Sequence, residues 1–279
     1  MRAGLASILA VVLVVAACTD SGTGATPPTS ASPAPTETAT LAPVELTILG
    51  AASLSGGLAA AKTAYQAANP GVTLVISTDS SPALETKIEQ GAPADIFLSA
   101  DTTNPAKLVT AGLANGAPVV FAGNKLTVIV PTDNPAGIAS PKDLARMGVK
   151  VIAAGATVPI TKYATMLVAN LAREAGYPAG FVAAYNANVV SMEENVKAVV
   201  AKIELGQGDA AIVYVTDARA STKVKTIDVP ATANVPASYA GVVVKASANA
   251  AAAQAFLSWL AGPDGQAVLA PFGFLAPGS

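Results

Sequence analysis

The chain has 279 residues, of which 52% are hydrophobic and 12% are charged, with a formal net charge of −2. This balance predicts a globular α/β protein of one large or two modest domains, and the lack of a basic block argues against a nucleic-acid partner. The chain has no histidine and one cysteine, Cys18. An internal disulfide and a cysteine-based zinc site are therefore excluded, and the commonest general base is missing.

The first 43 residues differ from the rest in composition. Met1–Cys18 has a positive start, an apolar run and small residues before the cysteine. Its apolar run is shorter than the ~20 residues of a membrane-spanning helix, as is typical of a secretory signal. Val15-Ala-Ala-Cys18 also resembles a bacterial lipobox, in which the cysteine is lipidated; the alternative is an ordinary signal peptide with a chance cysteine. Residues 19–43 contain mostly Thr, Ser, Pro, Ala and Gly, which predicts a flexible linker.

The stretch Leu46–Leu58 predicts a strand that passes through a turn of small residues into a helix. Leu54 and Leu58 then lie on one helix face, together with Ala61. Unpaired N–H groups and the positive end of the helix dipole gather at such a joint, so it is a potential anion site. Ser53 adds a hydroxyl there. The alternative is that Ser53 is only a structural cap.

A second joint of the same kind follows. Val72–Ser77 is a β-branched run that predicts a buried strand. Ser81 is then expected to cap a helix that has Pro82 at its first position and that Gly91 closes. Further elements are predicted before residue 113, namely a strand over 95–98 and a helix from Asn104.

The alternation of strands and helices restarts at Lys125. Long helices are expected from Pro159 to about Ala175 and, after a capping box at Ser191–Glu194, around Val196. A shorter helix is expected from Ser140 and the last helices from about Ser247 onward. Strands are predicted over residues 126–130, 149–153, 210–214, 224–229 and 242–244.

This order of elements predicts an α/β fold with mostly parallel sheets. In such folds ligands gather beyond the carboxyl ends of the strands. Ser53, Ser81, Pro159 and Tyr214 all stand at predicted strand ends or helix starts. We therefore expect these residues to meet at one site.

Several motifs, in one consistent order between about residues 46 and 275, resemble the molybdate-binding proteins of bacterial ABC importers. The motifs are Ala51–Leu54, Gly91–Asp101, Val158-Pro159, Glu194–Val196, Ala211–Ala218 and Phe272–Phe274. The resemblance implies a two-lobed periplasmic-binding-protein fold of type II, with the ligand cleft between two α/β lobes. Residues 44–122 and 238–279 are expected to form the first lobe and residues 123–237 the second, with crossings near Gly123–Lys125 and Pro236–Tyr239.

The same resemblance implies a function and a set of ligands. It implies an extracytoplasmic, non-enzymatic protein that captures molybdate, and tungstate as well, for the permease subunits of an ABC importer. By motif, Ser53 and Ser81 would donate hydroxyls, Ile160 and Val196 backbone N–H groups, and Tyr214 its phenol. No cofactor and no cationic metal are expected, and the chain is expected to be a monomer anchored to the membrane through lipid on Cys18.

Two departures from the family pattern and three rival functions stay open at this stage. The first departure follows Pro159, where Ile160 is bulkier than the usual small residues and Lys162 introduces a charge that the family normally lacks. The second is Pro82, which has no N–H, so the second joint must rely on Ser81. The rivals are a binder of sulfate, phosphate or ferric ion, a secreted hydrolase, and a surface scaffold without a ligand. Val215 after Tyr214 counts against the paired tyrosines of ferric sites, and a hydrolase would need a base other than histidine. Asp95 and Asp101 are expected to have structural roles rather than to bind a metal.

Overall fold

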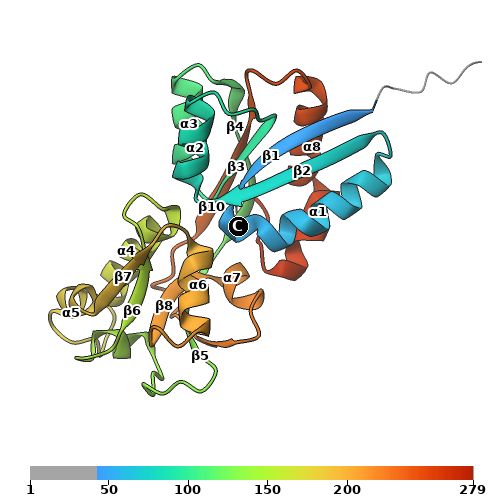
Figure 1. Ribbon diagram of the computed structural model, residues 1–279. Helices are drawn as coiled ribbons and strands as arrows, with labels where there is room; N and C mark the ends of the chain where they lie inside the picture. Colours follow the sequence, from blue (N-terminus) through green and yellow to red (C-terminus); the bar gives the residue numbers. More distant parts are fainter. Residues whose placement is uncertain (1–42, 279) are drawn as a thin grey trace, which may run out of the picture. The chain divides into compact units, whose positions relative to one another are not determined.

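The computed structural model describes residues 43–278 (Figure 1). The predicted signal peptide, the lipidation of Cys18 and the linker up to residue 42 lie outside the described residues. Leu41–Ser279 form one compact unit. In the described part of the chain, no helix is both long and apolar enough to cross a membrane.

The first lobe contains a five-stranded sheet with the order β2-β1-β3-β10-β4. Strands β1, β2 and β3 are parallel, and β10 runs antiparallel to both β3 and β4. The strands of this sheet are β1 (Val44–Ala51), β2 (Val72–Asp79), β3 (Ile96–Ser99), β4 (Ala114–Asn124) and β10 (Ala237–Val244).

Helices cover both faces of this sheet, because successive strand residues point to opposite sides. Ile48 packs in one buried cluster with Leu58 and Phe256, while its neighbour Leu49 packs in another with Leu84 and Leu108. Helices α1, α8 and α9 therefore lie on one face, and α2 and α3 on the other (Figure 1). The helices are η1 (Ala52–Leu54), α1 (Ser55–Ala68), α2 (Ser81–Glu89), α3 (Thr103–Thr110), α8 (Ala250–Ala261), α9 (Pro263–Leu269) and η3 (Ala270–Phe272).

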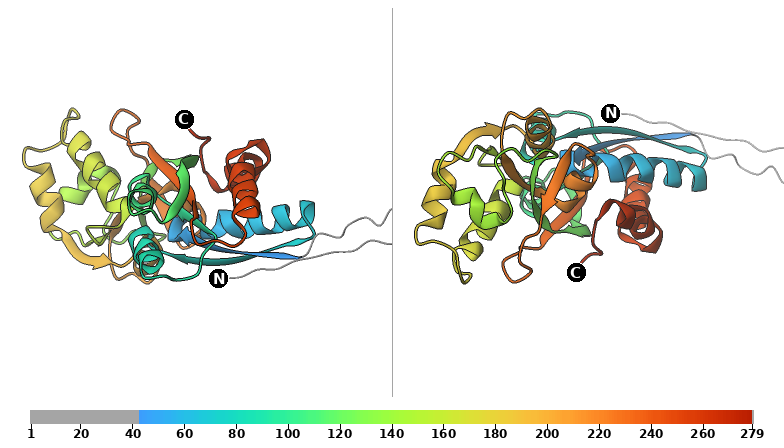
Figure 2. Two further views of the ribbon diagram at one scale, coloured as in Figure 1. Left: turned by 90° about the horizontal axis from the view of Figure 1, so that it is seen from above. Right: turned by 90° about the horizontal axis from the view of Figure 1, so that it is seen from below.

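The second lobe contains a five-stranded sheet with the order β7-β6-β8-β5-β9. Strand β6 is parallel to β7 and β8, and β5 is antiparallel to β8 and β9. Figure 2 shows α4 and α5 of this lobe at the opposite end of the molecule from α1 and the C-terminal helices. The elements are β5 (Leu126–Pro131), η2 (Pro141–Ala145), β6 (Val151–Ala154), α4 (Pro159–Leu171), α5 (Phe181–Ala187), β7 (Val189–Glu193), α6 (Val196–Glu204), β8 (Ala210–Tyr214), α7 (Val215–Arg219) and β9 (Val224–Ile227).

The predicted fold class is confirmed, since two sheets flanked by helices form an α/β architecture. Each sheet is mixed, with three parallel strands extended by antiparallel pairings. Strand β4 is not predicted from the sequence, because Gly116 and Pro118 interrupt its first half. A proline is tolerated at a sheet edge, which is where β4 lies, and its register with β10 shifts at this point.

Four local predictions need correction. The strand predicted over Val72–Ser77 forms as β2, but it is an edge strand in which only Leu74 is buried, so the expected burial is wrong. Ser80 rather than Ser81 is the N-cap of α2, so Ser81 is already the first helical residue. The expected capping box at Ser191–Glu194 is wrong, because Ser191 lies in β7 and Asn195 caps α6 instead. The predicted helix beyond Pro159 ends at Leu171, four residues before the expected end at Ala175.

Candidate functional site

The carboxyl ends of strands from both lobes meet at one small cavity. In the first lobe Ala51 lies opposite Asp79 in the parallel register, so Ser53 and Ser81, each two residues further on, emerge side by side. In the second lobe the segments after β6, β7 and β8 supply the facing wall. The lining residues are Ala51, Ala52, Ser53, Ser80, Ser81, Ala100, Val158, Pro159, Ile160, Asn195, Val196 and Tyr214.

The structure thus brings all five sequence-predicted residues, Ser53, Ser81, Ile160, Val196 and Tyr214, to a single cavity. Two polar neighbours that sequence reasoning missed, Ser80 and Asn195, line it as well. Ser80 and Asn195 are residue types that favour helix N-caps, and each directly precedes a predicted site residue. That signal in the sequence could have found them.

The two serine hydroxyls are held by groups of the protein. Ser81 is 1% exposed, and its Oγ accepts a hydrogen bond of 3.1 Å from the backbone N–H of Ala100. The Oγ of Ser53 lies 2.9 Å from the hydroxyl of Tyr239. Because Ser81 Oγ accepts a hydrogen bond from a protein donor, its own hydrogen remains for an acceptor inside the cavity.

Two helix starts face the serines. Ile160 is the second residue of α4 after Pro159, and Val196 is the first residue of α6. The first N–H groups of an α-helix have no partner within the helix and lie at the positive end of its dipole. The amide oxygen of Asn195 accepts from the N–H of Ala198 at 3.0 Å, which fixes the start of α6. Both helices therefore direct electropositive backbone groups toward the cavity.

Tyr214 stands out among the lining residues. It is 1% exposed, and its hydroxyl is buried without a hydrogen-bond partner among the described residues. Burial raises the pKa of Tyr214 well above its ordinary value, so the phenol keeps its hydrogen. A buried hydroxyl without a partner costs about 1–3 kcal/mol. Such a hydroxyl is expected to form a hydrogen bond with a ligand or a water molecule.

The lining contains no charged side chain among the described residues. Lys162, which could have supplied a positive charge, is exposed and does not line the cavity. Asp101 accepts hydrogen bonds from Ser99 and Asn104, and Asp95 accepts from Thr47, so both carboxylates have structural partners. The cavity therefore presents neutral hydrogen-bond donors.

The cavity is also small. Its volume is about 10 Å³, which is enough room for about one water molecule. A compact ligand larger than water would enter only with a small movement of the walls. Sugars and peptides are far too large.

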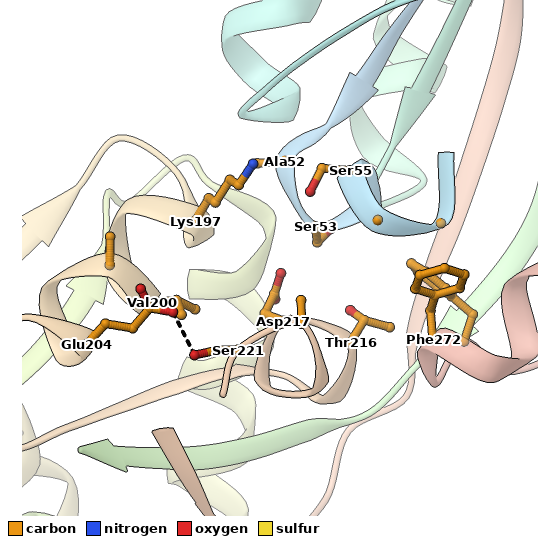
Figure 3. A pocket seen from close by; sticks show the side chains of 15 residues that line it. Ala52, Ser53, Ser55, Lys197, Val200, Glu204, Thr216, Asp217, Ser221 and Phe272 are labelled. Carbon is orange, nitrogen blue, oxygen red and sulfur yellow. Dashed lines mark hydrogen bonds between the residues drawn. The ribbon is translucent and has the colours of Figure 1, made fainter. Parts of the chain in front are cut away.

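A second, larger cavity of about 200 Å³ borders the first at Ala52 and Ser53 (Figure 3). Lys197, Glu204 and Asp217 line it, and Glu204 accepts a hydrogen bond from Ser221. Burial raises the pKa of Asp217 to about 7, against the opposing effects of the Tyr214 N–H, 3.2 Å from the carboxylate, and of Lys197. A carboxyl group whose pKa is raised to about 7 thus lines the cavity that borders the candidate site.

Comparison with known proteins finds a matching family and similar chains. A model of the family described as bacterial extracellular solute-binding protein matches residues 46–275. The molybdate-binding protein ModA of Mycobacterium tuberculosis is 32% identical over 278 residues, which cover 99% of this chain and 98% of that protein.

Two solved structures have a similar fold. The periplasmic molybdate-binding protein of Azotobacter vinelandii has a TM-score of 0.71 at 26% identity, covering 83% of this chain and 99% of that chain. The sulfate-binding protein SubI of Mycobacterium tuberculosis has a TM-score of 0.72 at 24% identity, covering 83% and 86%. The second likeness concerns the fold alone.

Proposed function

This chain belongs to the family of bacterial extracellular solute-binding proteins, and from that premise we propose that it captures molybdate for an ABC importer. The observation that carries the proposal is the buried hydroxyl of Tyr214, which has no hydrogen-bond partner among residues 43–278 and lies in a neutral cavity with Ser53, Ser81 and two helix starts. The similarity to molybdate-binding relatives supports the same ligand. Tungstate, of the same shape and charge, is proposed as a second ligand.

The chemistry of the cavity supports a fully deprotonated tetrahedral dianion. Such an ion offers only acceptors, and the candidate groups are donors. Hydrogen bonds to a charged group contribute about 1.5–3 kcal/mol each, so five of them contribute about 7.5–15 kcal/mol and exceed an association cost of ~4–15 kcal/mol over most of its range. A protonated oxyanion such as hydrogen phosphate would need an acceptor, and the site as proposed has none to offer.

Calorimetric titration of the protein with molybdate, tungstate, sulfate and phosphate tests the proposal. We expect binding of molybdate and tungstate and no measurable heat from phosphate. Sulfate is the rival ligand, because the small volume of the cavity suits the smaller dianion. Binding of sulfate without molybdate would make the chain a sulfate binder, and no heat from any of the four would refute oxyanion capture.

Val196→Pro is expected to weaken molybdate binding by about 10–100-fold, because it removes one N–H donor worth ~1.5–3 kcal/mol. Proline is well tolerated at the first helical position. The preceding Asn195 already has extended backbone angles, φ −155° and ψ 167°, that suit a residue before proline. Val196→Ala is the matched control, since it trims the side chain and keeps the N–H. Equal affinities of the two variants would remove this backbone donor from the site.

Two further features of the function remain proposals. We place the lobe boundaries near Gly123–Lys125 and Pro236–Tyr239, as supported by the end of β4 at Asn124 and the start of β10 at Ala237.

We also propose that a monomer is tethered outside the cytoplasm by lipid on Cys18, as supported by the lipobox-like Val15–Cys18. Metabolic labelling with a fatty acid checks the tether. The tether would be contradicted if the wild-type protein took up no more labelled fatty acid than the Cys18→Ser variant.

A further inference from the structure

The hydroxyl of Ser53 is the end of a chain of hydrogen bonds that starts at the crossing between the lobes. Tyr239 of β10 lies 2.9 Å from Ser53 Oγ, although 186 residues separate the two in sequence. The amide nitrogen of Asn124, the last residue of β4, lies 3.2 Å from the Tyr239 hydroxyl and 2.9 Å from Thr216 Oγ1 of α7. Figure 3 shows Ser53 lying opposite the turn of α7 that carries Thr216.

The direction of each bond in this chain follows from which atoms are able to donate. The backbone N–H of Lys125 lies 2.9 Å from the side-chain oxygen of Asn124, and a backbone N–H only donates. The side-chain nitrogen of Asn124 therefore faces Tyr239, and a side-chain amide nitrogen also only donates. The Tyr239 oxygen thus accepts from Asn124. Among the described residues, Ser53 Oγ is the one acceptor within hydrogen-bond reach of the Tyr239 hydroxyl, so we assign the Tyr239 hydrogen to Ser53.

A serine oxygen that accepts from Tyr239 keeps its own hydrogen for another acceptor. The opposite orientation, in which Ser53 donates to Tyr239, would turn the lone pairs of Ser53 toward the cavity. Lone pairs facing a dianion repel it, whereas the hydroxyl hydrogen attracts it. Burial and the nearby Asp217 carboxylate raise the pKa of Tyr239 well above its ordinary value, so its hydrogen is retained.

We propose that Tyr239 and Asn124 are positioning residues that orient the Ser53 hydroxyl as a donor to the bound oxyanion. This inference rests on the proposed function. It gives a role to two buried polar side chains that do not line the small cavity.

A double-mutant cycle tests the proposal, with molybdate as the probe in calorimetry. Ser53→Ala is expected to weaken binding about 10–100-fold and Tyr239→Phe about 3–30-fold. If Tyr239 acts through Ser53, the double variant binds within about threefold of Ser53→Ala alone, because the hydroxyl that Tyr239 orients is already gone. Tyr163→Phe is the control, since it removes the hydroxyl of another buried tyrosine, which accepts a hydrogen bond from the N–H of Ser238. This variant should leave the affinity unchanged.

The outcomes separate this inference from the proposed function. A wild-type protein that does not bind molybdate refutes the proposed function. Two results would overturn only the positioning role while the wild type binds molybdate. One is that the losses of affinity of the two single variants multiply in the double variant. The other is that Tyr239→Phe binds with unchanged affinity. Should Tyr239→Phe not fold, Asn124→Ala replaces it in the cycle and is measured both in the wild type and in the Ser53→Ala variant. Its loss should likewise vanish in the Ser53→Ala background, and a loss that persists there overturns the proposal.

Discussion

Replacing Ser81 with aspartate is expected to abolish molybdate binding. Ser81 is 1% exposed and lines the cavity, so the new carboxylate would face the ligand without screening by water. Two unit charges 4 Å apart interact by about 4 kcal/mol at an effective dielectric of 20, and a dianion doubles this repulsion to about 8 kcal/mol. Since 1.4 kcal/mol is a factor of ten, this repulsion alone corresponds to more than five orders of magnitude. Protonation of the carboxyl group on binding, from an ordinary pKa of about 3.9, limits the expected loss at pH 8 to about four orders of magnitude.

Calorimetry at about pH 8, where the carboxylate is ionised, is the measurement. Ser81→Asn is the control for size, because it adds a neutral polar group of similar volume. Ser81→Ala should cost only ~1–3 kcal/mol, for the loss of one donor. Circular dichroism establishes that each variant is folded. A folded Ser81→Asp variant that binds as well as Ser81→Asn would place the anion away from Ser81.

Asp217→Asn is expected to change how stability depends on pH. The pKa of Asp217 is raised from 3.8 to about 7 in the folded protein, first of all by burial. The folded state therefore holds this proton more tightly than the unfolded chain. Its contribution to stability is complete below about pH 4 and is lost as the pH rises through about 7. At 1.36 kcal/mol per pKa unit the wild type loses roughly 4 kcal/mol across this window.

The asparagine variant lacks this titration, while its side-chain oxygen is still able to accept from the Tyr214 N–H. The unfolding free energy of Asp217→Asn minus that of the wild type should therefore rise by roughly 4 kcal/mol from about pH 4 to about pH 7. Urea unfolding at several pH values measures it. Asp79, Asp143 and Glu193, whose pKa values are lowered, give the opposite slope, but they are common to both proteins and cancel in the difference. A difference that stays constant with pH would contradict the raised pKa.

Features that have a local cause were predictable from the sequence. Apolar β-branched runs such as Val72–Ser77 predict strands, and the small residues and hydroxyls after them predict helix starts with free N–H groups. Because the carboxyl ends of parallel strands meet at one edge, the order of the elements alone predicts that residues at those ends lie together. The family resemblance is confirmed by the family match over residues 46–275 and by the 32% identity to a molybdate-binding protein. The ligand roles of Ile160 and Val196, which that resemblance suggested, stay predictions.

Features that depend on distant segments became visible only in the folded chain. Pairing with β10 makes a strand of Ala114–Asn124 despite Gly116 and Pro118. The contact of Tyr239 with Ser53 joins residues 186 positions apart, and the raised pKa of Asp217 arises because the folded chain buries its carboxyl group. Contacts and burial of this kind do not produce a periodic pattern in a short stretch of sequence, so they are not predictable from it. They exist only when the chain has folded and brought these segments together.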